Sequence, residues 1–571
     1  MSKNLQGITR EQLQNCEDEP LHIIGLVQSI GYIIVLDVET LEIVQVSENI
    51  DQLTGEKPKH MVGASIDEFF STSFLHGFEN LLETMDLEGS NSFFFEQGRC
   101  DYIVNSHLSD DYLVLEIEKD QKSQREKTHT RYSALIDNIV QELDGYDDIN
   151  DICKIAIEKL SVVTGFNRLM VYRFDEDDHG EVIAEKKTEE MPSYMGLKFP
   201  SSDIPAQARK LYVKNIMRGI WNVDDEPSPI IPERRKKDDK LLDLSSAFLR
   251  SVSPVHITYL KNMGVQASFS ISIVIGGKLW GLILCHHTEN PLQLDIHQRR
   301  ACMFTGKMLA YKIETIQSNS LIIGYRKKLS TLQKVLSSLQ AENDIHNVFK
   351  KNEDTLLNAF NADGYAFVYN GRSSHSSSAS GEWTASKAID LLGKPEDEVF
   401  YSHHLQNDYP ELGNLAQAPA GILVIRTSNK MKEGLLLFRK EQIHEVNWAG
   451  KQEKNDNQKI NLTPRNSFEK WSELIKGQST KWSSEEIQFA EEFRMSLIEN
   501  IIAHSVKLPE KQQDDTRALK VRLIERMREL ETINQLQFSE LLELRALSGK
   551  HNLLSAVAEE KRHLRSTENF A

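Results

Sequence analysis

The chain has 571 residues, 40% of them hydrophobic, and carries 67 basic against 85 acidic side chains, a net charge of −18. This length allows about three or four domains, and the acidic balance argues against a general surface for nucleic acid or anionic membranes. No apolar run approaches the ~20 residues that cross a bilayer, and the N-terminus lacks the apolar core of a secretory signal. We therefore expect a cytoplasmic protein whose partners include no nucleic acid and no membrane.

The cysteines are few and far apart. There are five, and no CxxC pair occurs among Cys16, Cys100, Cys153, Cys285 and Cys302. A disulfide framework or a zinc site is not expected from this spacing, and a reducing compartment fits it. Cys16 stands out because it lies in a polar leader, residues 1–20, where a thiol has little structural reason to be.

Alternating apolar residues in the next part of the chain predict a small antiparallel sheet domain at 21–125. The strands are expected in "GYIIVLDVETLEIVQVSENI", "SFFFEQGRCDYIVNSHL" and "DYLVLEIEK". A charged linker, "DQKSQREKTHTR", follows, and helical patterns cover residues 131–145 and 148–164.

A second antiparallel sheet is predicted within residues 126–315. Its strands are expected at "RLMVYRF", "GEVIAEK", "ASFSISIVI" and "KLWGLILCHH", the last two joined at Gly276-Gly277, a strong hairpin signal. Residues 187–262 form a long insertion between these strands, which indicates a binding site rather than a simple connection.

Within this insertion, "FPSSDIP" at residues 199–205 places one carboxylate between serines and prolines. Local chemistry predicts a helix start here. Pro205 suits a first helical turn, and Ser202 or Asp203 can cap a helix that begins at Ala206. A functional role for the Asp203 carboxylate remains open at this level.

The rest of the chain is dominated by helical patterns around one more sheet. A nearly continuous helix is expected from Asp295 to about Phe360, and a third α+β domain at 316–508, with strands in "GYAFVYNG", "GILVIRTS" and "EGLLLFRK". A polar excursion covers residues 447–471, and a further helix runs from about Ser484 to Val506. Residues 509–571 are expected to be helical, either as a solvated amphipathic helix or as a parallel coiled-coil dimer.

Taken together, the motifs resemble the photosensory core of a bacteriophytochrome. The resemblance rests on "CEDEPLHI", "LMVYRFDEDDHGEVIAE", "FPSSDIPAQARKLY", "LRSVSPVHITYLKNMGVQASFSISIV", "GKLWGLILCHH" and "WAG…TPRNSFEKW", which occur in the family's order. It implies an α+β fold of three consecutive antiparallel-sheet domains, PAS, GAF and PHY, joined by long helices and followed by a helical or coiled-coil segment. The excursion at 447–471 would be the PHY tongue.

The resemblance also implies a cofactor, biliverdin IX-alpha, attached covalently to Cys16. Arg218 and Arg250 would grip its propionates, since a guanidinium can hold a carboxylate with two hydrogen bonds. The resemblance assigns the remaining site residues as Met170, Tyr172, Phe199, Asp203, Ile204, Pro205, Tyr212, Ser253, His256, Tyr259, Ser268, Ser270 and His286, with no catalytic or metal site. Asp203 would reach the tongue through Arg465, with Ser467 beside it.

Three details refine this expectation. Val255 stands where relatives that attach a more reduced bilin carry a cysteine, which favours biliverdin on Cys16 and far-red absorption. The leader, in the family threaded through the insertion, departs from the usual sequence at Ile24, Ser29 and Ile30. Asp178 stands where tryptophan is common.

The output is not evident from the sequence. We find no phosphoacceptor, ATP-lid or Gly-Gly-Asp-Glu-Phe motif and expect no catalytic domain in this chain. The expected function is a red/far-red photoreceptor that signals along its helices, as a homodimer through the GAF, PHY and C-terminal helices, to a downstream signalling protein. The alternatives are the photosensory part of a truncated histidine kinase or diguanylate cyclase, and a GAF-type sensor of a small ligand unrelated to light.

Overall fold

The computed structural model of the chain describes residues 19–84, 91–120, 138–139, 141–342, 344–376, 398–410, 419–428, 432–450 and 467–505. Two compact units emerge. The first comprises Met1–Lys327, His404–Asn414 and Lys440–Thr480, and the second comprises Lys328–His403, Leu415–Arg439 and Lys481–Ala571. Within the described residues, no helix is both long and apolar enough to span a membrane.

The first sheet belongs to the first unit and has seven strands in the order β1-β11-β3-β2-β6-β5-β4, all antiparallel. Five of its strands follow the predicted alternation: β2 (Gly31–Asp37), β3 (Ile43–Ser47), β4 (Asn91–Gln97), β5 (Cys100–Ser109) and β6 (Tyr112–Asp120). Short helices α1 (Asp51–Thr54) and α2 (Pro58–Met61) and the longer α3 (Thr72–Thr84) cover one face, where Phe74 is fully buried.

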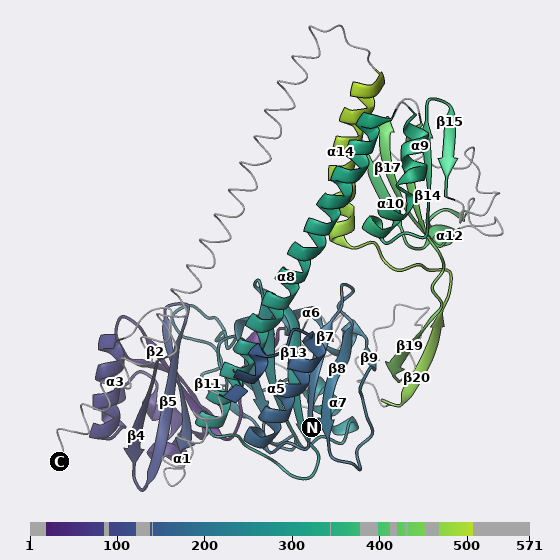
Figure 1. The fold of residues 1–571 in the computed structure, drawn as a ribbon. Helices are drawn as coiled ribbons and strands as arrows, with labels where there is room; N and C mark the ends of the chain where they lie inside the picture. The colour runs from purple at the N-terminus through teal and green to yellow at the C-terminus, as the bar shows by residue number, and fades with distance from the viewer. Residues whose placement is uncertain are drawn as a thin grey trace. The chain divides into compact units, whose positions relative to one another are not determined.

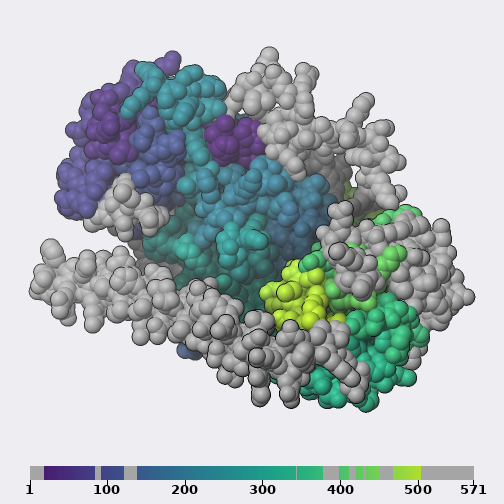
Figure 2. Space-filling model, turned by 90° about the horizontal axis from the view of Figure 1, so that it is seen from above, coloured from purple at the N-terminus to yellow at the C-terminus, as the bar shows by residue number. Residues whose placement is uncertain are grey.

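The other two strands of this sheet come from unexpected places. β1 (Leu26–Val27) follows the short helical turn η2 (Leu21–Ile23), and β11 (Ser228–Ile231) comes from the long insertion. Residues 21–28 are hydrogen-bonded to β11 on one side and to residues 244–251 on the other. Residues 21–28 are thus flanked on two sides by the insertion, which lies in teal against the purple first sheet (Figure 2). Ser29, one of the atypical leader residues, donates its backbone N–H to the Asp225 carboxylate at 3.0 Å.

The second sheet has eight strands in the order β10-β12-β13-β7-β8-β9-β19-β20. Its strands from the middle of the chain are β7 (Arg168–Phe174), β8 (Gly180–Lys187), β9 (Lys198–Phe199), β10 (Met217–Ile220), β12 (Ala267–Ile275) and β13 (Lys278–His287). The predicted hairpin at Gly276-Gly277 is confirmed, and both glycines have positive φ, which L side chains rarely adopt. The insertion also carries α6 (Ala206–Lys214) and α7 (Pro254–Asn262).

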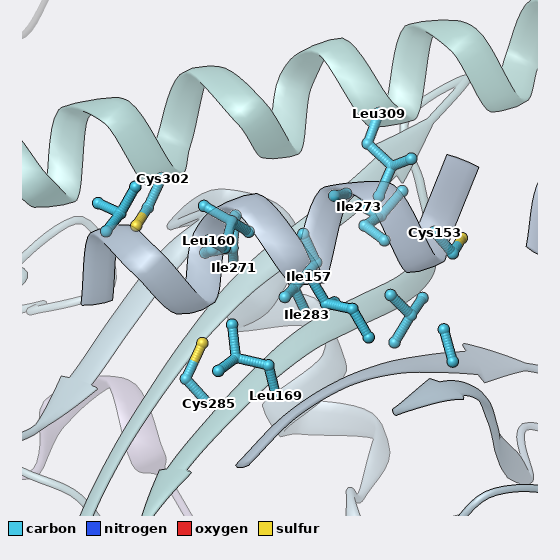
Figure 3. Packing of buried hydrophobic residues seen from close by; sticks show 14 of the residues in the cluster. Cys153, Ile157, Leu160, Leu169, Ile271, Ile273, Ile283, Cys285, Cys302 and Leu309 are labelled. Carbon is cyan, nitrogen blue, oxygen red and sulfur yellow. The ribbon is translucent and has the colours of Figure 1, made fainter. Parts of the chain in front are cut away.

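One face of this sheet forms the largest apolar core of the unit. Helix α5 (Ile149–Thr164) begins at the N-cap Asp148, whose carboxylate accepts from two backbone N–H groups, and ends at Gly165 in the left-handed conformation. Side chains of α5 and of the first turns of α8 (Ile296–Ala341) pack there on Leu169, Ile271 and Ile283 (Figure 3). Cys153, Cys285 and Cys302 point into the same core.

The last two strands of the second sheet come from the excursion. β19 (His444–Ala449) and β20 (Lys470–Ile475) form an antiparallel hairpin with six paired positions, and β19 meets β9 in parallel only at Trp448 and Lys198. Figure 1 shows the two strands as a separate ribbon beside β9. The expected tongue at 447–471 is therefore a hairpin where it is described, and its strands extend beyond those bounds. Residues 451–466 lie outside the described residues.

The second unit contains a five-stranded antiparallel sheet in the order β15-β14-β18-β17-β16. Its elements are α9 (Ile345–Lys351), α10 (Glu353–Phe360), β14 (Gly364–Tyr369), β15 (Arg372–His375), β16 (Val399–Ser402), β17 (Gly421–Ser428), β18 (Glu433–Arg439) and α14 (Ser484–Ser505). Another helix, α12 (Leu405–Asp408), belongs to the first unit. The nearly all-helical pattern predicted from Asp295 to about Phe360 is confirmed, but it is divided among three helices, because α8 ends at Ala341 and Asp344 caps α9 by accepting from the His346 N–H.

The three sheets, antiparallel apart from the single β9–β19 pairing, confirm the predicted α+β class. The domain boundaries 21–125, 126–315 and 316–508 stay predictions. The C-terminal segment 509–571 lies outside the described residues.

Candidate functional site

The second sheet offers a polar row on the face opposite its core. Cross-strand pairing places Arg218 opposite Ser270, Ser270 opposite Leu284, and Leu284 opposite Met170, on four adjacent strands. Directly opposed residues share one face of a sheet, so these side chains form a continuous row. Ser268 lies one step further along β12 and is paired with His286. The predicted alternation is confirmed, since the intervening Phe269 belongs to the core.

Helix α7 brings a second group of residues to the site. Ser253 is its N-cap and accepts from the Val255 N–H at 3.2 Å, while its hydroxyl donates to the Glu19 carboxylate at 2.9 Å. One turn later the rings of His256 and Tyr259 stack with centroids 6.1 Å apart. The Tyr259 hydroxyl donates to Oδ2 of Asp203 at 3.1 Å. The insertion thus joins α7 to the "FPSSDIP" turn through a side-chain hydrogen bond.

The expectation that Ser202 or Asp203 caps α6 is wrong. Pro205 occupies the N-cap position without a side-chain cap, and Asp203 closes a short helical turn, η6 (Ser201–Asp203), before it. Arg209 instead stabilises this segment by donating to the Ile204 carbonyl at 2.6 Å and to the Asp178 carboxylate at 2.6 Å. Because this turn ends before α6 begins, the Asp203 carboxylate does not cap the helix. It accepts a hydrogen bond from the Tyr259 hydroxyl instead.

An apolar cluster adjoins this turn. Tyr172 and Phe199 meet with ring centroids 5.7 Å apart, both 4% exposed, and Met170 belongs to the same cluster. Ile204 and Tyr212 pack against it from the insertion. Tyr259, expected beside Tyr172 and Phe199, packs on His256 and edge-on to Phe468 at 5.2 Å.

Two buried guanidinium groups, those of Arg218 and Arg250, lie at this site. Arg218 and Arg250 are each 7% exposed, and neither is within ion-pair distance of a carboxylate among the described residues. Arg218 donates to the backbone carbonyls of Phe248, Arg250 and Ser251, and Arg250 donates to the Leu21 carbonyl. Burial, and secondarily the Arg250 charge, lowers the pKa of Arg218 well below its usual value, and burial lowers the pKa of Arg250 to about 10. Two buried guanidinium groups without a carboxylate at ion-pair distance among the described residues make this site attractive to an anion.

The two site histidines are neutral at physiological pH. Burial, together with the Arg218 charge, lowers the pKa of His256 to about 4. Burial lowers the pKa of His286 to about 3, with further contributions from Arg168 and His256. The buried Nδ1 of His286 and Nε of Arg250 have no hydrogen-bond partner among the described residues. The site therefore holds unsatisfied polar atoms of the kind that a polar ligand would engage.

The hairpin β19–β20 reaches this site from the far edge of the sheet. Ala449 is fully buried in the cluster around Tyr172, and Phe468 packs against the same cluster and Tyr259. Trp448 meets the His179 ring edge-on at 5.3 Å. Ser467 is exposed, and Cys16 and Arg465 lie outside the described residues.

Sequence reasoning missed two residues on the site face, Arg168 and Ser272. Arg168 is paired with His286 across the strands, forms an ion pair with Glu185 at 3.4 Å and lies over the Tyr194 ring at 4.0 Å. Ser272 continues the serine row, and its buried hydroxyl has no partner among the described residues. The i, i+2 spacing from Ser268 and Ser270 would have indicated Ser272.

Comparisons with known proteins follow the same order of domains. Residues 16–120 match the family model "PAS fold", residues 148–315 match "GAF domain", and residues 328–506 match "Phytochrome region". Cyanobacterial phytochrome B of Nostoc sp. is 33% identical over 571 residues, which covers 98% of this chain and 74% of that protein. A bacteriophytochrome of Pseudomonas aeruginosa is 31% identical over 520 residues, covering 89% and 69%.

Solved structures similar to this chain are also phytochromes. Bacteriophytochrome RpBphP3 of R. palustris has a TM-score of 0.74 at 28% identity, covering 86% of this chain and 99% of that one. The photosensory core module of the Stigmatella aurantiaca phytochrome has a TM-score of 0.72 at 30% identity.

The fold and the site therefore define a photosensory core of PAS, GAF and PHY domains. The chain belongs to the phytochrome family. It is a light photoreceptor with a linear tetrapyrrole chromophore, which excludes the alternative of a small-ligand sensor unrelated to light.

Proposed function

We propose that the chromophore is biliverdin IX-alpha, bound covalently through Cys16, and that the protein is a red/far-red photoreceptor. The observation that carries this proposal is the pair of buried guanidinium groups, Arg218 and Arg250, without a carboxylate partner among the described residues. A bilin carries two propionates, which can accept the fork of donors that each guanidinium presents.

The choice of Cys16 is supported by the other thiols. Cys153, Cys285 and Cys302 are buried in the core on the opposite face of the second sheet, and burial raises the pKa of each. A buried thiol with a raised pKa forms little of the reactive thiolate. Cys100 lies on the first sheet, and position 255 on α7 holds valine. Cys16 is therefore our proposed attachment residue; in the sequence it precedes residues 21–28, which the insertion holds on two sides.

The neutral site residues suit the remaining contacts of such a ligand. The Asp203 backbone, His256 and His286 would supply acceptors and donors for pyrrole nitrogens and the ring D carbonyl, with Ser268 and Ser270 along the polar row. When bound, the bilin supplies photoisomerisation, in which the double bond between its rings C and D turns after light absorption. Tyr172 and Phe199, whose rings are tilted by 58° to each other, would bound the space in which that ring moves.

We propose that the signal leaves the site through the tongue. Its strand β19 is attached to β9 at one paired position, against six within the hairpin, so little backbone pairing opposes its release. A strand rises ~3.3 Å per residue and a helix 1.5 Å, so refolding of the tongue toward a helix would shorten it and pull on the PHY domain. Arg465 would bind Asp203 in the hairpin state. This is a two-state element biased by the ligand.

A second copy of the chain is the proposed partner along the long helices. On α8, Phe304 is 36% exposed, Tyr311 49% and Leu321 49%. At 3.6 residues per turn these three side chains lie along one side of the helix, and large apolar side chains grouped on a surface mark an interface. Residues 509–571 would extend this dimer as a coiled coil and pass the signal to a downstream signalling protein. Cytoplasmic localisation belongs to the same proposal. A truncated kinase or cyclase remains the alternative for the output.

The test is assembly of the purified chain with biliverdin. We expect a far-red absorption band that changes reversibly under red light, and a covalent band that fluoresces with zinc on a denaturing gel. Cys16→Ala should lose the fluorescent band, and the matched control Cys100→Ala should keep it. Attachment that survives Cys16→Ala, or that occurs only with a more reduced bilin, would contradict the proposal. Leu321→Glu should yield a monomer by light scattering if this side of α8 pairs with a second copy.

A further inference from the structure

Glu116 is a carboxylate on a buried apolar face. Along β6, Leu113, Leu115 and Ile117 face the core of the first sheet, and Val114 faces the insertion. Glu116 therefore lies on the face that the insertion covers, and it is 3% exposed. A buried carboxylate is costly unless its oxygens accept hydrogen bonds, so its partners indicate its purpose.

The partners of Glu116 are backbone groups of the insertion. One oxygen accepts from the Phe248 N–H at 3.1 Å and the other from the Leu249 N–H at 2.6 Å. The neighbouring buried carboxylate, Glu118, pairs instead with Arg299 of α8 at 2.9 Å. Both oxygens of Glu116 are thus used to hold two successive peptide groups in one orientation.

The same turn presents its carbonyls to the chromophore site. Arg218 donates through Nη1 to the Phe248 carbonyl at 3.3 Å and through Nη2 to the Ser251 carbonyl at 2.7 Å and the Arg250 carbonyl. Arg250 itself projects from this turn. Glu116 of the first sheet therefore holds the turn at 248–251 by its N–H groups. The carbonyls of the same turn orient Arg218, and Arg250 is part of the turn.

We infer that Glu116, a residue of the first sheet, is a positioning residue for the chromophore site: its carboxylate holds the turn at 248–251 and, through it, the two arginines. This inference rests on the proposed function, in which Arg218 and Arg250 bind the propionates. A carboxylate is suited to this task because both of its oxygens accept, whereas an amide would turn one donor toward a backbone N–H. Its negative charge also favours the protonated form of both arginines.

The charge of Glu116 changes near neutral pH. Burial raises its pKa to about 7, opposed by the N–H groups of Leu249 and Phe248. The charged or titratable groups facing it are His107 on β5, whose Nδ1 lies 3.5 Å from Oε1, Glu118 on β6, Arg299 on α8, and Arg218 and Arg250 on the site side. Burial lowers the pKa of His107 to about 4, so this ring stays neutral over the range in which Glu116 titrates.

The experiment compares Glu116→Gln with Glu118→Gln, a buried carboxylate on the same strand that does not bind the turn. In the apoprotein, hydrogen exchange should show protection factors of the Phe248 and Leu249 amides reduced about tenfold in Glu116→Gln, since one hydrogen bond to a charged group is lost. Glu118→Gln should leave them unchanged. With biliverdin, Glu116→Gln should weaken non-covalent binding about tenfold in a Cys16→Ala background, and Glu116→Asp should recover part of it.

The wild-type protein supplies an independent measurement. Its red absorption band and the protection of the two amides should change between pH 5.5 and 8.5 with a midpoint near 7, and Glu116→Gln should abolish that step. A wild-type protein without such a step, or a Glu116→Gln variant with unchanged affinity and spectrum, would overturn the inference. Failure of the wild type to bind biliverdin would instead refute the proposed function, and the exchange measurement on the apoprotein would still test whether Glu116 holds the turn.

Discussion

Gly180 gives the sharpest test of how tightly Tyr172 is held. It begins β8 and is paired with Phe174 and Phe199. A Cβ added at Gly180 would lie 1.6 Å from Cζ of Tyr172 and 2.0 Å from its hydroxyl oxygen. The Tyr172 ring cannot turn aside freely, because Phe174 packs on it edge-on at 5.3 Å and Phe199 at 5.7 Å.

The magnitude of the effect follows from this geometry. Carbon atoms need about 3.5 Å, so Gly180→Ala must displace the Tyr172 ring by about 2 Å. Overpacking of this kind costs about 1–3 kcal/mol in the free energy of unfolding. At about 2–4 °C per kcal/mol for a domain of 150–250 residues, the melting temperature should fall by about 2–12 °C.

The assay is thermal denaturation of the apoprotein, together with the absorption spectrum after assembly with biliverdin. Gly180→Ala should lower the melting temperature and displace the far-red band, because Tyr172 bounds the chromophore. Gly145→Ala is the control, since its added Cβ would be 3.5 Å from the nearest atom, the Glu142 carbonyl oxygen. Adding Tyr172→Leu should make the cost of Gly180→Ala small, as expected for directly coupled sites. A Gly180→Ala protein that melts and absorbs like wild type would refute this reasoning.

Three further predictions concern charged groups. Arg439→Met should destabilise the second unit by about 3–5 kcal/mol in urea denaturation followed by tryptophan fluorescence, because it leaves Glu486, its partner at 2.7 Å, unpaired; a loss below 1 kcal/mol would contradict this. The pKa of Glu116 is raised from 4.5 to about 7 in the folded state, so folding favours the protonated carboxyl. The unfolding free energy of wild type relative to Glu116→Gln should therefore fall by up to about 3 kcal/mol as pH rises from 4.5 to 7. A difference that does not change with pH would contradict this prediction. Asp178→Asn removes the charge that pairs with Arg209 at 2.6 Å, and because Asp178 is 55% exposed, stability should change by less than about 1 kcal/mol. Arg209 also donates to the carbonyl of Ile204, beside Asp203, so the absorption band after assembly with biliverdin should shift, and an unchanged band would refute this coupling.

Much of the fold could be predicted from local patterns. The strands β2, β6, β7 and β12 and the hairpin at Gly276-Gly277 are visible in the chain, because strands buried along most of their length are rich in apolar residues and positive φ favours glycine. The same alternation put Ser268 and Ser270 on one face. The candidate site residues were named by resemblance, and the structure brings most of the described ones together around the second sheet, α6 and α7.

The remaining features depend on partners far away in the sequence. Local alternation reports which side of a strand is buried, but not which edge it joins, so β11 could not be assigned to the first sheet or β19–β20 to the second. Asp203 has the sequence of a helix cap, yet the hydroxyl of Tyr259, 56 positions later, binds its carboxylate. Glu116 has the sequence of an exposed strand residue, and only the insertion folded over β6 buries it. Sequence alone thus determined most of the helices and strands and the residue types of the site. Tertiary structure decided which groups each buried charge is hydrogen-bonded to, because burial and strand pairing depend on the whole fold.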